Sequence, residues 1–118
     1  MSDPPDRVVE RLRHMLEAAR TIQSYAARGR NAFDSDSAIR DAILYQIVVL
    51  GEAAKVVSKS AASFGELLSQ EDLSLLSRMR DRISHRYWET DHEIVWSTAI
   101  SDIPTLSIAL NKAIERLA

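Results

Sequence analysis

Apolar residues recur at helical spacing through almost the whole sequence, and this periodicity constrains the fold more than any other feature. The first stretch, residues 5–27, carries an apolar side chain at every third or fourth position, namely Val8, Leu12, Met15, Ala19, Ile22 and Ala26. No run alternates apolar and polar residues as a half-buried strand would, and only three glycines and three prolines interrupt the chain. The sequence therefore predicts an all-α fold.

Two further helices are expected in the middle of the chain. The first begins at a capping aspartate, either Asp34 or Asp36, and is closed off by Gly65. Its apolar surface is wider than one stripe, which indicates either a central place in the bundle or a second face buried by a partner chain. The next helix is short, begins with the capping-box-like pattern Ser69–Asp72 and continues through Ile83.

The last predicted helix begins at Thr90, where Thr90 and Glu93 are spaced as a capping box, and continues to the C-terminus. Pro104 interrupts it, because proline lacks an amide donor and its ring clashes with the preceding turn, so we expect a kink near Ile100. Short connections between four amphipathic helices favour an antiparallel four-helix bundle. With 118 residues, we expect one domain that covers residues 1–118.

The composition excludes several functional classes. The chain has no cysteine, which rules out disulfides, zinc thiolate sites and thiol catalysis. Its N-terminus lacks the apolar core of a signal peptide and no stretch is long enough to span a bilayer, so we expect a cytoplasmic protein without a membrane partner. A net charge of −2 argues against broad electrostatic capture of nucleic acid, so any nucleic-acid chemistry must be local.

Positive charge is concentrated between residues 78 and 86, where four arginines face a single aspartate, Asp81. Cations at a helix C-terminus gain about 0.3–1 kcal/mol from the macrodipole, so one interpretation is a well-placed helix end. The segment continues, however, into His85, Tyr87 and Trp88, which place an imidazole and two aromatic rings beside charges that suit phosphate. This combination predicts a site for RNA.

The string from Arg80 to Tyr87 resembles the Arg-(four residues)-His-X-Tyr signature of HepT-like toxins in the HEPN superfamily. Further marks of the family follow in the expected order: Arg40-Asp41-Ala42, Leu50–Lys55, Met79, Trp88, Ile94-Val95-Trp96 and Asp102-Ile103-Pro104. Two positions depart from the usual pattern. Asp81 stands where asparagine is frequent, and Arg86 replaces a frequent glycine, which bears on how tightly the chain turns after His85.

The resemblance implies a HEPN-like helical domain that acts as a metal-independent endoribonuclease, without a cofactor, as the toxin of a type II toxin–antitoxin system. A 2′-hydroxyl of the RNA attacks the adjacent phosphate, His85 carries the proton and Arg80 stabilises the charge on the phosphoryl oxygens. Asp81, Arg82 and Arg86 are expected to support this site or to bind RNA.

The resemblance also implies an antitoxin, an MntA-type nucleotidyltransferase that attaches AMP to Tyr87. Tyr87 lies seven residues after Arg80 and would share its azimuth on a regular helix. An anionic adduct on Tyr87 would then occupy the phosphate site and neutralise Arg80.

Helical geometry restricts how Arg80 and His85 can meet. Five residues correspond to about 140° of rotation and about 7.5 Å of rise, so the two side chains diverge on one straight helix. They converge if the helix unwinds near Ser84, or if two copies of the helix meet across a two-fold axis. The resemblance implies a homodimer of the second kind.

Two other functions compete with the ribonuclease. One is a non-catalytic HEPN-like module that binds a nucleotide or a nucleotidyltransferase, and the other is a helical-bundle interaction protein. The remaining candidate residues are weaker. We expect His14 and His92 near the surface and outside any metal set. Glu52 and Lys55, near Gly51, are candidates to support the site, with packing or surface roles favoured over it.

Overall fold

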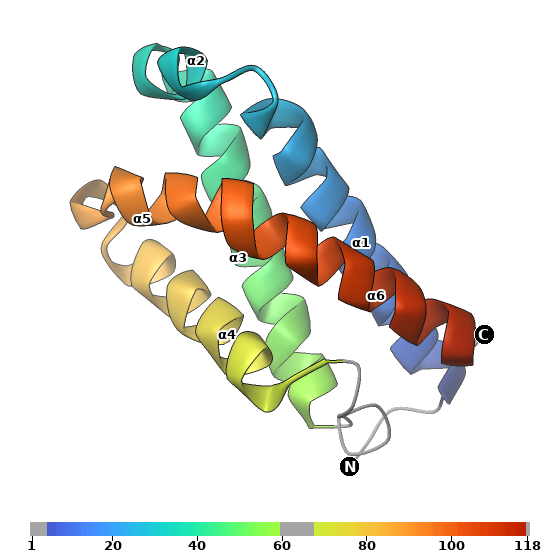
Figure 1. Cartoon of the computed structure of the whole chain (residues 1–118). Coiled ribbons are helices and arrows are strands. Elements are labelled where there is room, and N and C mark those ends of the chain that lie inside the picture. Colours follow the sequence, from blue (N-terminus) through green and yellow to red (C-terminus); the bar gives the residue numbers. More distant parts are fainter. Residues whose placement is uncertain (1–4, 60–67, 118) are drawn as a thin grey trace.

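The computed structural model describes residues 5–59 and 68–117, and within them it contains helices and no strand. The α-helices are α1 (Pro5–Ala26), α2 (Arg30–Ser35), α3 (Ser37–Ser58), α4 (Gln70–His85), α5 (His92–Ser97) and α6 (Ile103–Leu117). A 3₁₀ turn (Tyr87–Glu89) links α4 to α5, and a π-helical segment (Thr98–Asp102) joins α5 to α6. Figure 1 shows α1, α3, α4 and the α5–α6 rod packed antiparallel, which confirms the predicted all-α bundle.

The N-terminal half contains one helix that the sequence did not predict. After α1, Gly29 adopts a φ of 96°, the left-handed conformation that glycine tolerates, and the short α2 follows. Phe33 anchors α2 in the core, and Arg40 donates from Nη1 to the backbone oxygens of Phe33 (3.0 Å) and Asp34 (2.8 Å). Of the two predicted caps, Asp36 is the one that begins α3, because its carboxylate accepts from the Ala38 amide.

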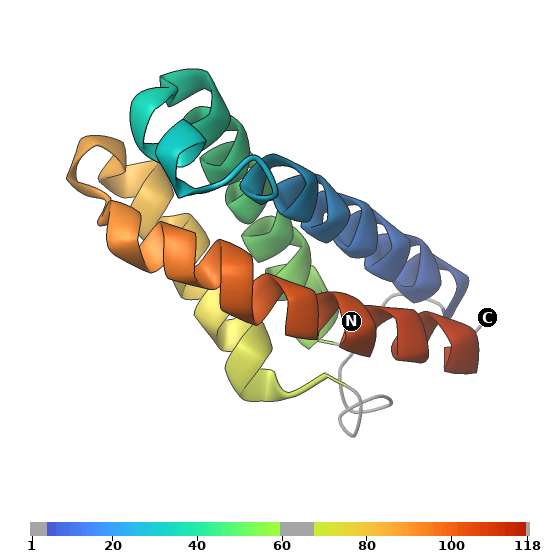
Figure 2. The ribbon, with the colours of Figure 1, turned by 45° about the horizontal axis from the view of Figure 1, so that its top comes forward.

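Helix α3 lies between α1 and α4 and contacts both (Figure 2). Leu44 is buried, and Val48 and Val49 pack against the core as partly buried side chains. The central position therefore accounts for the wide apolar surface of this helix. Gly65, predicted to close the helix, lies outside the described residues.

The helix starts in the C-terminal half are only partly as predicted. Ser69 caps α4, because its hydroxyl accepts from the Asp72 amide at 3.0 Å. The capping box at Thr90 is wrong, since Asp91 caps α5 by accepting from the Glu93 amide at 2.9 Å. The Glu93 carboxylate instead forms an ion pair with Arg30 of α2.

The predicted interruption at Pro104 takes the form of a widened helical turn. The Ile103 amide donates to Thr98 O, five residues earlier, which defines the π-helical segment around Ile100. Pro104 has no amide hydrogen with which to continue the α-helical pattern, so the extra residue is accommodated just before it. The disruption therefore lies where the sequence predicted it.

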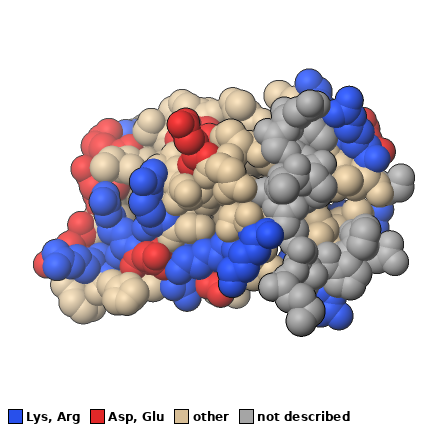
Figure 3. Space-filling view, turned by 90° about the horizontal axis from the view of Figure 1, so that it is seen from below, with Lys and Arg blue, Asp and Glu red and all other residues tan. Residues whose placement is uncertain are grey.

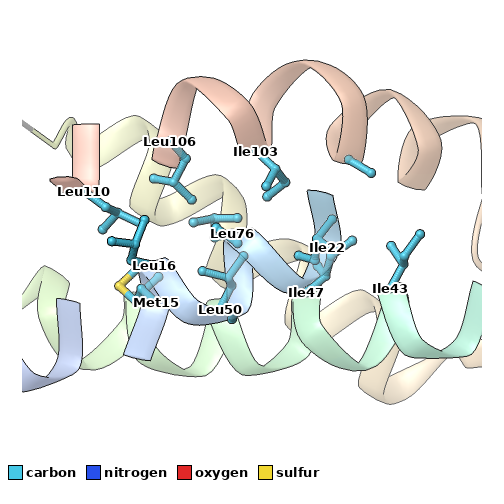
Figure 4. Packing of buried hydrophobic residues seen from close by; sticks show 14 of the residues in the cluster. Met15, Leu16, Ile22, Ile43, Ile47, Leu50, Leu76, Ile103, Leu106 and Leu110 are labelled. Carbon is cyan, nitrogen blue, oxygen red and sulfur yellow. The ribbon is translucent and has the colours of Figure 1, made fainter. Parts of the chain in front are cut away.

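The long helices meet in one hydrophobic cluster. Figure 4 shows these side chains converging from α1, α3, α4 and α6: Met15, Leu16, Ile22, Ile43, Ile47, Leu50, Leu76, Ile103, Leu106 and Leu110. This packing fixes α4, the helix from which the Arg80–Tyr87 signature begins, against α3. Among the helices of the described ranges, none is both long and apolar enough to cross a membrane.

Candidate active site

Gly51 of α3 lets α4 approach closely at Arg80. A Cβ atom added to Gly51 would clash with Arg80 Cβ and would lie 2.5 Å from the carbonyl oxygen of Leu76. The Arg80 side chain therefore packs along α3 and is only 28% exposed. The glycine fixes the position of the guanidinium through the spacing of the two helices.

Substitution Gly51→Ala is expected to lower the free energy of unfolding by about 1–2 kcal/mol. Forcing α3 and α4 apart costs about 1–3 kcal/mol, and the better helix propensity of alanine offsets up to about 1 kcal/mol of this. Urea denaturation measures the change, with Tyr45→Ala on the exposed face of α3 as a control expected to stay within about 0.5 kcal/mol. A Gly51→Ala protein as stable as the wild type would contradict the close approach.

An ion-pair network holds the Arg80 guanidinium. Nε of Arg80 lies 2.9 Å from Glu52 Oε2, without the alignment of a hydrogen bond, and Nη1 donates to Asp81 Oδ1 at 3.0 Å. Lys55 Nζ donates to the same Asp81 oxygen at 2.6 Å. The hydrogen bond from Lys55, and then that from Arg80, lowers the pKa of Asp81. Of the two roles considered for Glu52 and Lys55, the structure therefore shows the one that was not favoured, beside Arg80 and Asp81.

The network leaves one edge of Arg80 without a hydrogen-bond partner among residues 5–59 and 68–117. Its two cations and two carboxylates cancel in formal charge. Among the described residues, no hydrogen bond engages Nη2 of Arg80, although a guanidinium offers five N–H donors. The carboxylates therefore orient the group, while the Nη2 edge is available to an anion.

His85 is the last residue of α4 and is exposed. Its Nδ1 atom lies 2.7 Å from the backbone oxygen of Asp81. Because a carbonyl can only accept, Nδ1 carries the hydrogen and donates it, which leaves the lone pair of a neutral ring on Nε2. The helix thus selects the tautomer in which Nε2 can accept a proton.

Arg80 and His85 do not meet within one protomer. Helix α4 is regular as far as His85, so the predicted alternative of unwinding near Ser84 is wrong. Arg80 packs against α3, whereas His85 is exposed at the helix end, and five residues of regular helix turn the two side chains about 140° apart. The chain by itself presents two separate halves of a site.

Tyr87 follows α4 in the 3₁₀ turn, and its hydroxyl donates to Asp41 Oδ1 on α3. This hydrogen bond, and burial to a smaller extent, raise the pKa of Tyr87 above its usual value. Asp41 and Glu52 are eleven residues apart, about 16 Å along α3. The predicted common azimuth of Tyr87 and Arg80 is therefore wrong for one protomer, because α4 ends before Tyr87.

Arg86 makes the turn without the conformational freedom of glycine. Its φ of −139° and ψ of 54° lie outside the left-handed region, so an arginine is accommodated there. Its amide donates to Arg82 O at 2.9 Å, and its guanidinium lies 3.4 Å from Glu89. The departure from the family pattern at this position thus leaves a compact turn.

The face of α4 that points away from α3 is basic. Arg78 and Arg82 are exposed one helical turn apart and line a groove of about 710 Å³ between α4 and α5, whose other side carries Glu93 and Asp102. Figure 3 shows Lys and Arg side chains gathered on the side of the molecule where α4 lies, with acidic residues set among them. Trp88, 83% exposed, follows at the end of this face.

The remaining histidines lie apart from this region. His14 is exposed on α1, and the exposed His92 packs the edge of its ring against Phe33, with centroids 6.2 Å apart. In the described parts of the chain, no three histidine, aspartate or glutamate side chains are grouped so that they could hold a metal ion.

Known proteins match most of the chain. The family model described as "Ribonuclease HepT-like" matches residues 15–113. A "Putative RNase" of Methanocaldococcus jannaschii is 32% identical over 85 residues, which cover 72% of this chain and 71% of the relative. A "Probable ribonuclease HepT" of Thermococcus cleftensis is 30% identical over 74 residues, covering 63% and 64%. No solved structure gives a significant match.

Proposed function

Because the chain belongs to the ribonuclease HepT-like family, we propose that it is a metal-independent endoribonuclease and the toxin of a type II toxin–antitoxin system in the cytoplasm. One observation carries the proposal. A single helix presents a guanidinium oriented by carboxylates, whose Nη2 edge has no hydrogen bond to the described residues, and an imidazole whose tautomer leaves Nε2 able to accept a proton. These are the two groups that RNA cleavage by its own 2′-hydroxyl requires.

In the proposed reaction, His85 Nε2 takes the proton of a ribose 2′-hydroxyl, and the oxygen attacks the adjacent phosphorus. The bond from phosphorus to the 5′-oxygen of the next nucleotide breaks, that oxygen takes a proton from water, and His85 then gives up its proton to the solvent. The products are a 2′,3′-cyclic phosphate and a 5′-hydroxyl. Arg80 holds the phosphoryl oxygens through its Nη2 edge as their charge increases, and its loss would cost on the order of 10²–10³ in rate.

The active form is proposed to be a homodimer. Arg80 of one protomer and its own His85 lie on different sides of α4, so a complete site requires a second copy related by a two-fold axis. Each of the two sites would then combine Arg80 from one protomer with His85 from the other.

The basic face of α4 is proposed to bind the RNA strand beyond the cleaved bond. Arg78 and Arg82, about 6 Å apart along α4, and Arg86, which follows the helix, contact phosphates, while the exposed Trp88 stacks on a base. Asp81 supports the site indirectly, because it orients Arg80 and Lys55.

Control is proposed to come from an MntA-type nucleotidyltransferase that transfers AMP to Tyr87. The residue is 44% exposed in the turn after α4, so a second enzyme has access to it. The competing function, a non-catalytic module that binds a nucleotide or the nucleotidyltransferase, is favoured by the separation of Arg80 and His85 within one protomer.

A cleavage assay in chelator separates these functions. We expect the purified protein to cut a single-stranded RNA at an undiminished rate in excess EDTA and to leave 2′,3′-cyclic phosphate ends. The same sequence with 2′-deoxyribose should stay intact, because it lacks the nucleophile. Cleavage that EDTA abolishes and Mg²⁺ restores would contradict metal independence. Intact RNA together with measurable nucleotide binding would instead support the binding module.

A further inference from the structure

The turn that follows His85 has little that holds it to the rest of the molecule. Inside the turn, the Glu89 amide donates to Arg86 O (3.0 Å) and the Thr90 amide to Tyr87 O (3.3 Å). No residue of Tyr87–Glu89 is buried, and Trp88 is almost fully exposed. Hydrophobic burial therefore contributes little to its position.

One side-chain contact ties this turn to α3. Within the described residues, the hydrogen bond from the Tyr87 hydroxyl to Asp41 is the one that joins residues 86–90 to α3. Asp41 is itself held firmly, because it lies in the second turn of α3, and its neighbour Arg40 binds two carbonyl oxygens at the end of α2. The phenol is thus fastened to a rigid part of the fold.

We propose that Asp41 is a positioning residue that, through Tyr87, fixes the turn after α4 and thereby the orientation of His85. The phenolic hydrogen is essential to this contact, because the Asp41 carboxylate can only accept. Any group attached to the Tyr87 oxygen removes that hydrogen, breaks the contact and releases the turn. This inference rests on the proposed ribonuclease function and its control at Tyr87.

The contact explains how a modification at Tyr87 can act on a distant centre. The points where Tyr87 and Arg80 touch α3 are about 16 Å apart, so the Tyr87 hydroxyl and the Arg80 guanidinium bind different parts of α3. His85, however, lies two residues before Tyr87 and ends the helix to which the turn is attached. The raised pKa of Tyr87 reflects the same contact, because a hydrogen bond to the Asp41 carboxylate stabilises the protonated phenol.

The test combines hydrogen–deuterium exchange of the amides of residues 86–90 with steady-state RNA cleavage. Tyr87→Phe removes the donor and Asp41→Ala the acceptor, so each should speed exchange roughly three- to tenfold and lower kcat about tenfold with little change in KM. The double variant should show no further change, because both substitutions remove the same contact. Asp41→Asn, which keeps an acceptor oxygen, should fall between wild type and Asp41→Ala.

Tyr45→Phe is the matched control, because Tyr45 is an exposed tyrosine of α3, the helix that carries Asp41. This variant should match the wild type in both measurements. Unchanged exchange in Tyr87→Phe and Asp41→Ala overturns the inference whatever the activity. Additive effects in the double variant also overturn it. If exchange quickens as expected while the wild type cleaves no RNA, the contact stands and the proposed function fails.

Discussion

Replacing His85 by alanine is expected to lower kcat for RNA cleavage by about 10²–10⁴-fold, the usual contribution of a positioned general base. The variant loses Nε2, the atom that we propose takes the proton of the 2′-hydroxyl. Because His85 is exposed at the end of α4, its side chain contributes little to the core. Single-turnover cleavage measures the loss, and the melting temperature should stay within a few degrees of the wild type.

Two further variants make this result specific. His92→Ala removes another exposed histidine and should cleave RNA at the wild-type rate. His85→Asn keeps an N–H that can donate to Asp81 O but has no nitrogen that accepts a proton, so it should be as slow as His85→Ala. Retention of more than about a third of the wild-type rate in His85→Ala would exclude His85 as the general base.

The long helices could be predicted from the sequence because each carries its own local signals. Helix α1 has an apolar stripe that is buried from Val8 to Ile22, and Ser69 caps α4 as its spacing indicates. The six-residue α2 is too short to show a period. The predicted capping box of Thr90 and Glu93 is wrong because Glu93 pairs with Arg30, 63 residues earlier in the chain. A local sequence pattern cannot indicate such a contact.

In the candidate site, too, the residues that are contiguous in the sequence could be predicted, whereas the contacts between helices could not. The Arg80–Tyr87 string is contiguous, so it could be singled out by its charge and its spacing. Its partners Asp41, Glu52 and Lys55 come from α3, and the packing of α3 on α4 shows which group each of them contacts. In the sequence, Gly51 is the signal for this close packing of α3 on α4, since a glycine inside a helix marks a close approach. The prediction that Tyr87 lies at the same azimuth as Arg80 is wrong because α4 ends at His85, before Tyr87.

Mixing two inactive variants is expected to restore activity if each site combines two protomers. Arg80→Ala and His85→Ala homodimers should each be slower than the wild type by 10²-fold or more. In a mixed dimer, one site loses both groups while the other keeps both. Equal mixing with subunit exchange gives half mixed dimers, so cleavage should recover to about a quarter of the wild-type rate.

A second mixture distinguishes a site shared between two protomers from a complete site in each protomer, independently of the mixture of single variants. When wild type is mixed with an equal amount of the Arg80→Ala/His85→Ala double variant, a mixed dimer has no complete site if the groups come from different protomers. Activity should then fall to about a quarter, the share of wild-type homodimers. If each protomer carried a complete site, half of the activity would remain and the single variants would not complement each other. That pair of results would refute a shared site and require Arg80 and His85 to act on one phosphate from the same α4.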